Sequence, residues 1–248
     1  MHRTLMLLLA VLVVLLVVGT VRRRQAVRPT RPTATETTSG AAAAPPATPP
    51  ASDSARGAAR ALLARDAGQT YLDSMLASTD SLVRRWPQRG GSPFRIAILE
   101  GGSPDYGVRM AGFVREAASR WEAAGIGFWF SFTGDSADAD IVFRWRESFD
   151  SGNKAGETDL RWSNAGPVVR ATVSLATRNA GDSLFTDEAL LGAAVHELGH
   201  AMGLPHSGDE GDVMFPVTRV TTVSSRDRAT ARLLYALPPG SIRAPTPR

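Results

Sequence analysis

Three of the four histidines in this 248-residue chain lie within one short segment, residues 196–206. The segment reads HELGHAMGLPH, and the fourth histidine is His2. His196 and His200 are four residues apart, so a helix through them places both imidazoles on one face, one turn apart. Two imidazoles at this spacing can bind one metal ion. The sequence therefore predicts a metal site in this segment, with His206 close by.

Glu197 and Gly203 agree with this prediction. A carboxylate next to a ligand can reach a water on the metal without binding the metal itself, which is the position of a general base. Helices often end at a glycine with positive φ, and a turn at Gly203 would bring His206 back as a third ligand. Three protein ligands leave one position open, as in catalytic zinc sites, whereas structural zinc usually has four ligands, often cysteines. This chain has no cysteine.

The pattern HExxHxxGxxH resembles the signature of the metzincin zinc peptidases. Ser207 directly after the third histidine, and the sequence VMFP at 213–216, narrow the resemblance to the matrixin branch. The resemblance implies that Met214 forms a methionine turn, a hydrophobic floor below the metal ligands. It also implies a pocket for the substrate side chain after the cleaved bond, walled by residues from about Val217 to Val223, with Pro216, Val217 and Thr218 as candidate substrate-binding residues.

We therefore predict a zinc-dependent metalloendopeptidase, a hydrolase that acts on internal bonds of protein or peptide substrates. One catalytic Zn²⁺ on His196, His200 and His206 would lower the pKa of its water and polarise the scissile carbonyl. Glu197 would take the proton and return it to the leaving amine. One alternative is a membrane-tethered, zinc-containing binding module without catalysis. Another is an interaction protein in which an N-terminal helix carries the function and the metal domain is a scaffold.

From residue 94 onward, strand and helix patterns alternate as in a small α+β domain. Alternating apolar residues predict strands at 94–98, 128–132, 141–145 and 169–175, and an apolar face predicts a helix at 108–124. Together with the resemblance, this indicates a matrixin-like catalytic domain over 91–238. Its expected fold is a twisted, mainly parallel sheet with an antiparallel edge strand and about three helices.

Two helix starts carry capping signals. Thr186 is the predicted N-cap of the active-site helix. Ser224, followed three residues later by Asp227, resembles a capping box for a final helix that ends near Leu237.

The strand at 169–175 comes just before the active-site helix, and the resemblance makes it the edge strand. An exposed edge strand can pair with an extended peptide through main-chain hydrogen bonds. We therefore predict a substrate-binding rim over 170–176 that includes Arg170, Ala171, Thr172 and Val173.

Calcium is the second candidate ion. The stretch 149–160 combines acids, asparagine and glycine, which suits Ca²⁺, and many matrixins bind calcium and a structural zinc in this region. The alternative is a solvated turn. The same two interpretations apply to Asp209, Glu210 and Asp212. A histidine-rich structural zinc site cannot form, because His2 is the only histidine outside the signature.

The N-terminal part divides by composition. Residues 4–21 carry no charge and are long enough to span a membrane, and no convincing signal-peptidase site follows them. We predict that 1–25 is a transmembrane or signal-anchor segment and that 26–57, rich in Pro, Ala and Thr, is a disordered linker. Apolar spacing predicts a helical segment at 58–90, either packed on the catalytic domain or acting as a pro-segment. Residues 239–248 are predicted to be a disordered tail.

Two features give opposite indications for the membrane orientation. Arg22, Arg23 and Arg24 follow the apolar run, so the positive-inside rule would leave the catalytic domain in the cytoplasm. The linker composition instead suits a stalk that holds an enzyme off a membrane. We predict a membrane-anchored protein with the catalytic domain outside the cytoplasm; secretion after signal cleavage is the alternative.

The sequence pI of about 10.2 arises from the N-terminal part. Residues 1–93 contain 12 arginines and 5 acidic residues, whereas 94–248 contain 16 basic and 19 acidic residues. The predicted catalytic domain is therefore mildly acidic and shows no basic stripe with interleaved aromatic residues. We expect no nucleic-acid partner.

Overall fold

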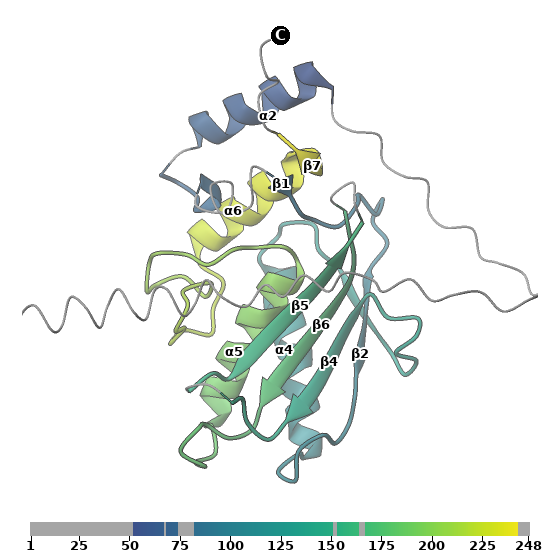
Figure 1. Ribbon diagram of the computed structural model, residues 1–248, viewed down its shortest axis with the longest axis vertical. Coiled ribbons are helices and arrows are strands. Elements are labelled where there is room, and N and C mark those ends of the chain that lie inside the picture. Colours follow the sequence, from purple (N-terminus) through teal and green to yellow (C-terminus); the bar gives the residue numbers. More distant parts are fainter. Residues whose placement is uncertain (1–51, 67, 74–81, 151–152, 164–166, 243–248) are drawn as a thin grey trace, which may run out of the picture. The chain divides into compact units, whose positions relative to one another are not determined.

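The computed structural model describes residues 52–66, 68–73, 82–150, 153–163 and 167–242 (Figure 1). The predicted membrane segment 1–25, and the predicted linker 26–57 except for its end, lie outside these residues. Across the described ranges, no helix is both long and apolar enough to cross a membrane.

A five-stranded sheet lies at the centre of the described structure. Its strand order is β3-β2-β4-β6-β5. The bounds are β2 (Phe94–Ile98), β3 (Phe130–Thr133), β4 (Ile141–Arg146), β5 (Gly156–Trp162) and β6 (Val168–Ala176). β2 pairs in parallel with β3 and β4, β4 pairs in parallel with β6, and β5 runs antiparallel to β6. The prediction of a mainly parallel sheet with an antiparallel edge strand is confirmed.

Among the described residues of the predicted catalytic domain, three helices accompany the sheet: α4 (Val108–Ala123), α5 (Asp187–Ala201) and α6 (Ser225–Ala236). α4 and α5 pack against each other and cover one face of the sheet (Figure 1). The buried side of α4 carries the apolar face that the sequence predicted: Met110, Val114, Ala117, Ala118 and Trp121. Burial of this face against α5 stabilises the helix more than its intrinsic propensity does.

The prediction that residues 170–176 form the edge strand is wrong. They belong to β6, which pairs with β4 on one side and with β5 on the other. The edge strand is β5, which arises from the polar stretch that the sequence left as a calcium loop or a turn. A strand with one solvated face needs few apolar residues, so β5 lacks the alternation that marked the other strands. Its inward positions include Gly156 and Thr158, neither of which gives an apolar signal.

The helical segment also differs from the prediction for 58–90. Helix α2 spans Asp53–Arg65, so it begins inside the predicted linker. Leu82 and Val83 form strand β1, which pairs antiparallel with β7 (Gly240–Ser241) in the predicted tail. Pairing with a partner far along the chain overrides the helix-like spacing of the apolar residues here.

Candidate active site

Helix α5 carries two of the predicted metal ligands, and its start is fixed by a cap. The Thr186 hydroxyl accepts a hydrogen bond from the Ala189 amide at 3.2 Å, as the sequence predicted. Asp187 and Glu188 lie in the first turn, where the helix dipole stabilises acidic groups. Nearly every residue of the C-terminal half of α5 is buried, so the histidines sit on a well-packed element.

The helix ends as predicted at Gly203, which has a φ of +96°. The Gly203 amide donates to the His200 carbonyl at 2.8 Å, and the Leu204 amide donates to the Gly199 carbonyl at 3.0 Å. This pair of bonds is a Schellman motif. A Cβ on Gly203 would lie 2.7 Å from the carbonyl oxygen of Arg84, so a side chain is excluded by space as well as by φ. The reversal brings the chain back to His206.

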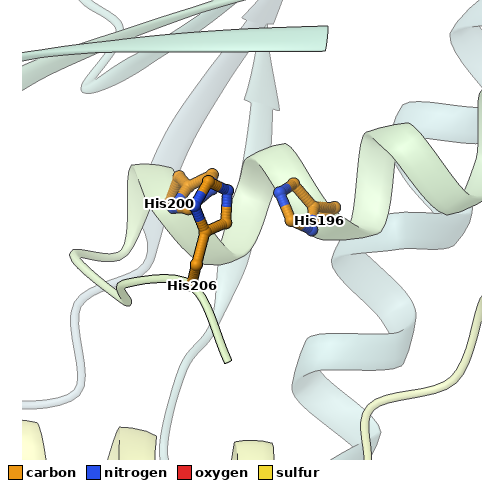
Figure 2. A group of neighbouring side chains, drawn as sticks. All are labelled: His196, His200 and His206. Atoms are coloured by element: carbon orange, nitrogen blue, oxygen red, sulfur yellow. The ribbon is translucent and has the colours of Figure 1, made fainter. Parts of the chain in front are cut away.

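The structure brings His196, His200 and His206 together. Each offers one ring nitrogen, and these atoms lie within 4.8 Å of one another, close enough for one metal ion. Figure 2 shows His196 and His200 on the same helix and His206 reaching them from the chain that follows. In the described part of the chain, this is the one group of three or more histidine or acidic residues with that geometry. This histidine cluster does not test the predicted calcium sites.

Main-chain carbonyls orient two of the rings. Nδ1 of His196 lies 2.7 Å from the Val213 carbonyl oxygen, and Nδ1 of His200 lies 2.7 Å from the Leu204 carbonyl oxygen. A carbonyl can only accept, so both Nδ1 atoms carry the proton and both Nε2 lone pairs are free for a metal. The donor set of three neutral imidazoles fits zinc.

Partial removal from water favours the neutral form of the rings, most strongly for the buried His196 and less for His206, which is exposed. It lowers the pKa of His196 and of His200 to about 3, and that of His206 to about 4, from an ordinary value of 6.5. The neighbouring histidines lower these pKa values further, because a second positive charge nearby is unfavourable. Neutral imidazole is the form that binds metal, so the site is prepared for an ion at neutral pH.

Glu197 is buried beside the histidines, with 6% of its surface exposed. The Thr158 hydroxyl donates to Oε2 of Glu197 at 2.7 Å and lies 3.0 Å from the Glu197 main-chain oxygen. A Cβ on Gly156 would lie 2.5 Å from Cγ and 2.6 Å from Oε1 of Glu197. Burial raises the pKa of Glu197 to about 7, and the bond from Thr158 opposes this rise. A carboxyl group with a pKa near the working pH suits general-base catalysis.

Met214 lies against α5 at Gly199, the residue before His200. A Cβ on Gly199 would overlap the Met214 sulfur and would lie 2.9 Å from a ring carbon of Trp121. The Met214 carbonyl accepts from the Ser207 amide at 2.8 Å, which ties the turn to the residue after His206. Met214 is fully buried. The Met214 side chain therefore packs tightly against the last turns of α5, at Gly199.

The model of the matrixin family matches residues 107–236, more than half of the chain. The chain belongs to the matrixin family. The match contains the three histidines, Glu197 and Met214. A search among curated proteins finds no match to the chain. As a matrixin, the chain is a metallopeptidase by family, and its three-histidine cluster is compatible with the catalytic zinc of that family.

The chain after the methionine turn lines a pocket in this matrixin. The pocket lies between the start of α5 and residues 218–220, and its lining residues are Thr186, Glu188, Ala189, Gly192, Thr218, Arg219 and Val220. Thr218 is one of the lining residues, and the prediction that it contacts the substrate stays a prediction. Pro216 and Val217 are exposed and are not among the lining residues.

The predicted substrate rim at Arg170, Ala171, Thr172 and Val173 does not lie on a free edge. Both neighbours of β6 are strands, so the main chain of these residues is already paired. Ala171 and Val173 are fully buried in the core. The Arg170 guanidinium donates to the main-chain oxygens of Ser136 and Ala137, at the turn before β4. These four residues therefore have no free main-chain edge with which an extended peptide could pair.

Sequence reasoning missed Gly156 and Thr158. Both precede the signature by about forty residues, and their contacts with Glu197 depend on how β5 pairs with β6. The GETDL run offered little signal, because Leu160 is the only apolar residue among Gly156, Thr158 and Leu160, which share one side of a strand.

Proposed function

We propose that this chain is a zinc-dependent endopeptidase in which Glu197 is the general base. The observation that carries the proposal is a buried carboxyl group beside three converging imidazoles, on the same helix as two of them. A purely structural zinc site has no use for a buried carboxylate that stays outside the ligand set. Burial of such a group costs free energy, so a chemical role explains its presence better.

In this proposal, His196, His200 and His206 hold the ion. A bound zinc ion polarises the scissile carbonyl and lowers the pKa of water. Glu197 accepts a proton from the attacking water as the new C–O bond forms. Glu197 then returns this proton to the amine nitrogen as the C–N bond breaks. One water is consumed for each peptide bond, and no covalent enzyme intermediate is needed.

We assign the substrate main chain to β5. This strand has a partner on one side, β6, and its other edge has no partner strand among the described residues. An extended peptide can add to such an edge through main-chain hydrogen bonds. Because Gly156 and Thr158 of β5 contact Glu197, a peptide on this edge would run beside the general base. The pocket beside residues 218–220 would take a substrate side chain.

The location follows from composition alone and is part of the proposal. The uncharged run 4–21 would anchor the protein, and the linker would hold the catalytic domain outside the cytoplasm. Protease added to intact cells that make the chain should remove the catalytic domain. Protection of this domain until the cells are lysed would place it in the cytoplasm instead.

The test of the function uses the full chain, purified in detergent, with fluorescent casein as substrate. We expect cleavage that stops when a chelator removes the metal and returns when one equivalent of zinc is added. Zinc bound one to one, without cleavage of casein or of a random peptide library, would contradict the proposal. That result would favour a zinc-containing binding module.

A further inference from the structure

The edge strand β5 crosses α5 at Glu197 and contacts its side chain at two points. Gly156 and Thr158 are two residues apart, so they face the same side of β5. Thr158 supplies a hydroxyl group, which donates to Oε2 of Glu197 at 2.7 Å. Gly156 has no side chain, and this leaves room for Cγ and Oε1 of Glu197.

The hydroxyl contact is specific. Within the described part of the chain, Thr158 is the one residue whose side chain hydrogen-bonds the Glu197 carboxylate. Threonine is branched at Cβ and has few χ1 rotamers, so its hydroxyl is held in place better than that of a serine. The same hydroxyl lies 3.0 Å from the Glu197 main-chain oxygen, which fixes its position relative to the helix as well as to the carboxylate.

The space at Gly156 is equally specific. A methyl group there would lie 2.5 Å from Cγ and 2.9 Å from Cδ of Glu197, closer than van der Waals contact allows. The Glu197 side chain would have to turn away, because the main chain of β5 is paired with β6 and cannot easily shift. Any residue other than glycine at 156 therefore changes the direction of the carboxylate.

We propose that β5 positions the general base, with Thr158 holding Oε2 of Glu197 and Gly156 leaving the space in which the carboxylate lies. This inference rests on the function proposed above. A general base must lie within about 2.6–3.2 Å of the proton it takes. A displacement of about 1 Å can lower a rate on the order of 100-fold. The same strand would pair with the substrate main chain. One strand would therefore fix the position of the Glu197 carboxylate relative to the substrate.

The test compares Thr158→Val, which has nearly the same shape but no hydroxyl, with Thr158→Ser, which keeps the hydroxyl. For Thr158→Val we expect kcat to fall about 10- to 100-fold, with KM within about twofold and one zinc per chain. Thr158→Ser should restore most of the loss. Thr133→Val, the same change on the opposite edge strand β3, is the matched control and should leave kcat unchanged.

Gly156→Ala provides a second variant that does not depend on the hydroxyl. It should also lower kcat at unchanged zinc content. Gly134→Ala is its control, because a Cβ there meets no atom within 4 Å. Equal kcat in the parent and in both Thr158→Val and Gly156→Ala would overturn the inference. So would an equal loss in Thr158→Ser and Thr158→Val, or a loss explained by missing zinc.

One measurement separates this inference from the proposed function. In metal-free protein, Thr158→Val should lower the urea midpoint of unfolding more in the parent than in a Glu197→Leu background, because that background lacks the carboxylate acceptor and keeps only the main-chain oxygen. Equal shifts in both backgrounds would show that the hydroxyl does not act on Glu197. If the shifts differ but the parent cleaves no substrate, the positioning contact stands and the proposed function fails.

Discussion

The indole nitrogen of Trp86 donates a hydrogen bond to the carbonyl oxygen of Ala201 at 2.7 Å, across 115 residues of sequence. Ala201 is the last residue of α5, so its carbonyl has no partner within the helix. The next carbonyl, of Met202, accepts from the Tyr235 hydroxyl at 3.0 Å. The segment before the catalytic domain is thus part of the support for the helix that carries the histidines.

Trp86→Phe keeps an aromatic ring in the core but leaves the Ala201 carbonyl without its donor. We expect the free energy of unfolding to fall by about 1–2 kcal/mol, the cost of one buried, unpaired acceptor. Urea unfolding of metal-free protein measures this. Trp129→Phe is the control: this side chain is 56% exposed, and its change should stay within about 0.5 kcal/mol. Equal effects of the two variants would argue against the bond.

Gly203→Ala should weaken zinc binding as well as the fold. The left-handed φ and the Arg84 carbonyl both oppose a Cβ, so we expect a loss of at least about 1–2 kcal/mol in stability. Because the turn at Gly203 returns the chain to His206, zinc affinity should fall too. Gly112→Ala in α4 meets no atom within 4 Å and should stabilise by about 0.5–1 kcal/mol. Unchanged zinc affinity in Gly203→Ala would contradict the role of the turn.

Asp227 joins three donors in the core. Its oxygens accept from the Tyr71 hydroxyl at 2.8 Å and from the amides of Val213 and Ser224 at 2.9 Å each. Asp227→Ala should cost at least about 3 kcal/mol, because three buried donors lose their acceptor. Zinc affinity should also fall, since the Val213 carbonyl orients His196.

Tyr71→Phe is the matched comparison for Asp227→Ala. It removes one donor and leaves the Val213 amide bonded, so we expect a loss of about 1 kcal/mol with unchanged zinc affinity. Zinc competition with a chromogenic chelator measures the affinity of both variants. Similar zinc affinity in the two variants would show that Asp227 does not influence zinc binding.

The stability of the metal-free protein should depend on pH through the histidines, chiefly His196 and His200, because His206 is exposed to solvent. Their pKa values are about 3 to 4 in the fold against 6.5 ordinarily, so the unfolded chain binds more protons between these limits. Their contribution to stability is complete above about pH 6.5 and is lost as the pH falls toward 3. Urea midpoints between pH 4 and 7 should rise with pH. A flat profile in this range would contradict the burial of neutral imidazoles.

Glu197 has the opposite dependence in metal-free protein. Its pKa is raised from 4.5 to about 7, so its unfavourable contribution develops as the pH rises through this window. Metal-free Glu197→Gln should therefore be more stable than the parent at pH 8, by on the order of 3 kcal/mol. The two proteins should be similar near pH 4.5. Equal stability at both pH values would mean that the carboxyl group is solvated.

Local signals predicted the centre of the site well. The histidine spacing, the glycine turn at Gly203, the cap at Thr186 and the box at Ser224 each involve contacts within a few residues. Such contacts are encoded where they occur, so one stretch of sequence suffices to recognise them.

Contacts between distant segments could not be predicted in the same way. Leu82, Val83 and Trp86 have helix-like spacing, but their partners lie more than a hundred residues away. Thr158 gives no apolar signal, since its inward side meets a carboxylate and not the core. The strand that contacts Glu197 was therefore assigned to a loop, and its neighbour β6 was assigned to the edge.

In the proposed mechanism, Glu197 moves the proton in hydrolysis while the three histidines hold the metal. The most direct measurement compares casein cleavage by the full-length parent and by Glu197→Gln, each shown by elemental analysis to contain one zinc per chain. We expect the variant to keep its zinc and to lose at least about 100-fold in kcat. A zinc-loaded variant that cleaves as fast as the parent would contradict this mechanism.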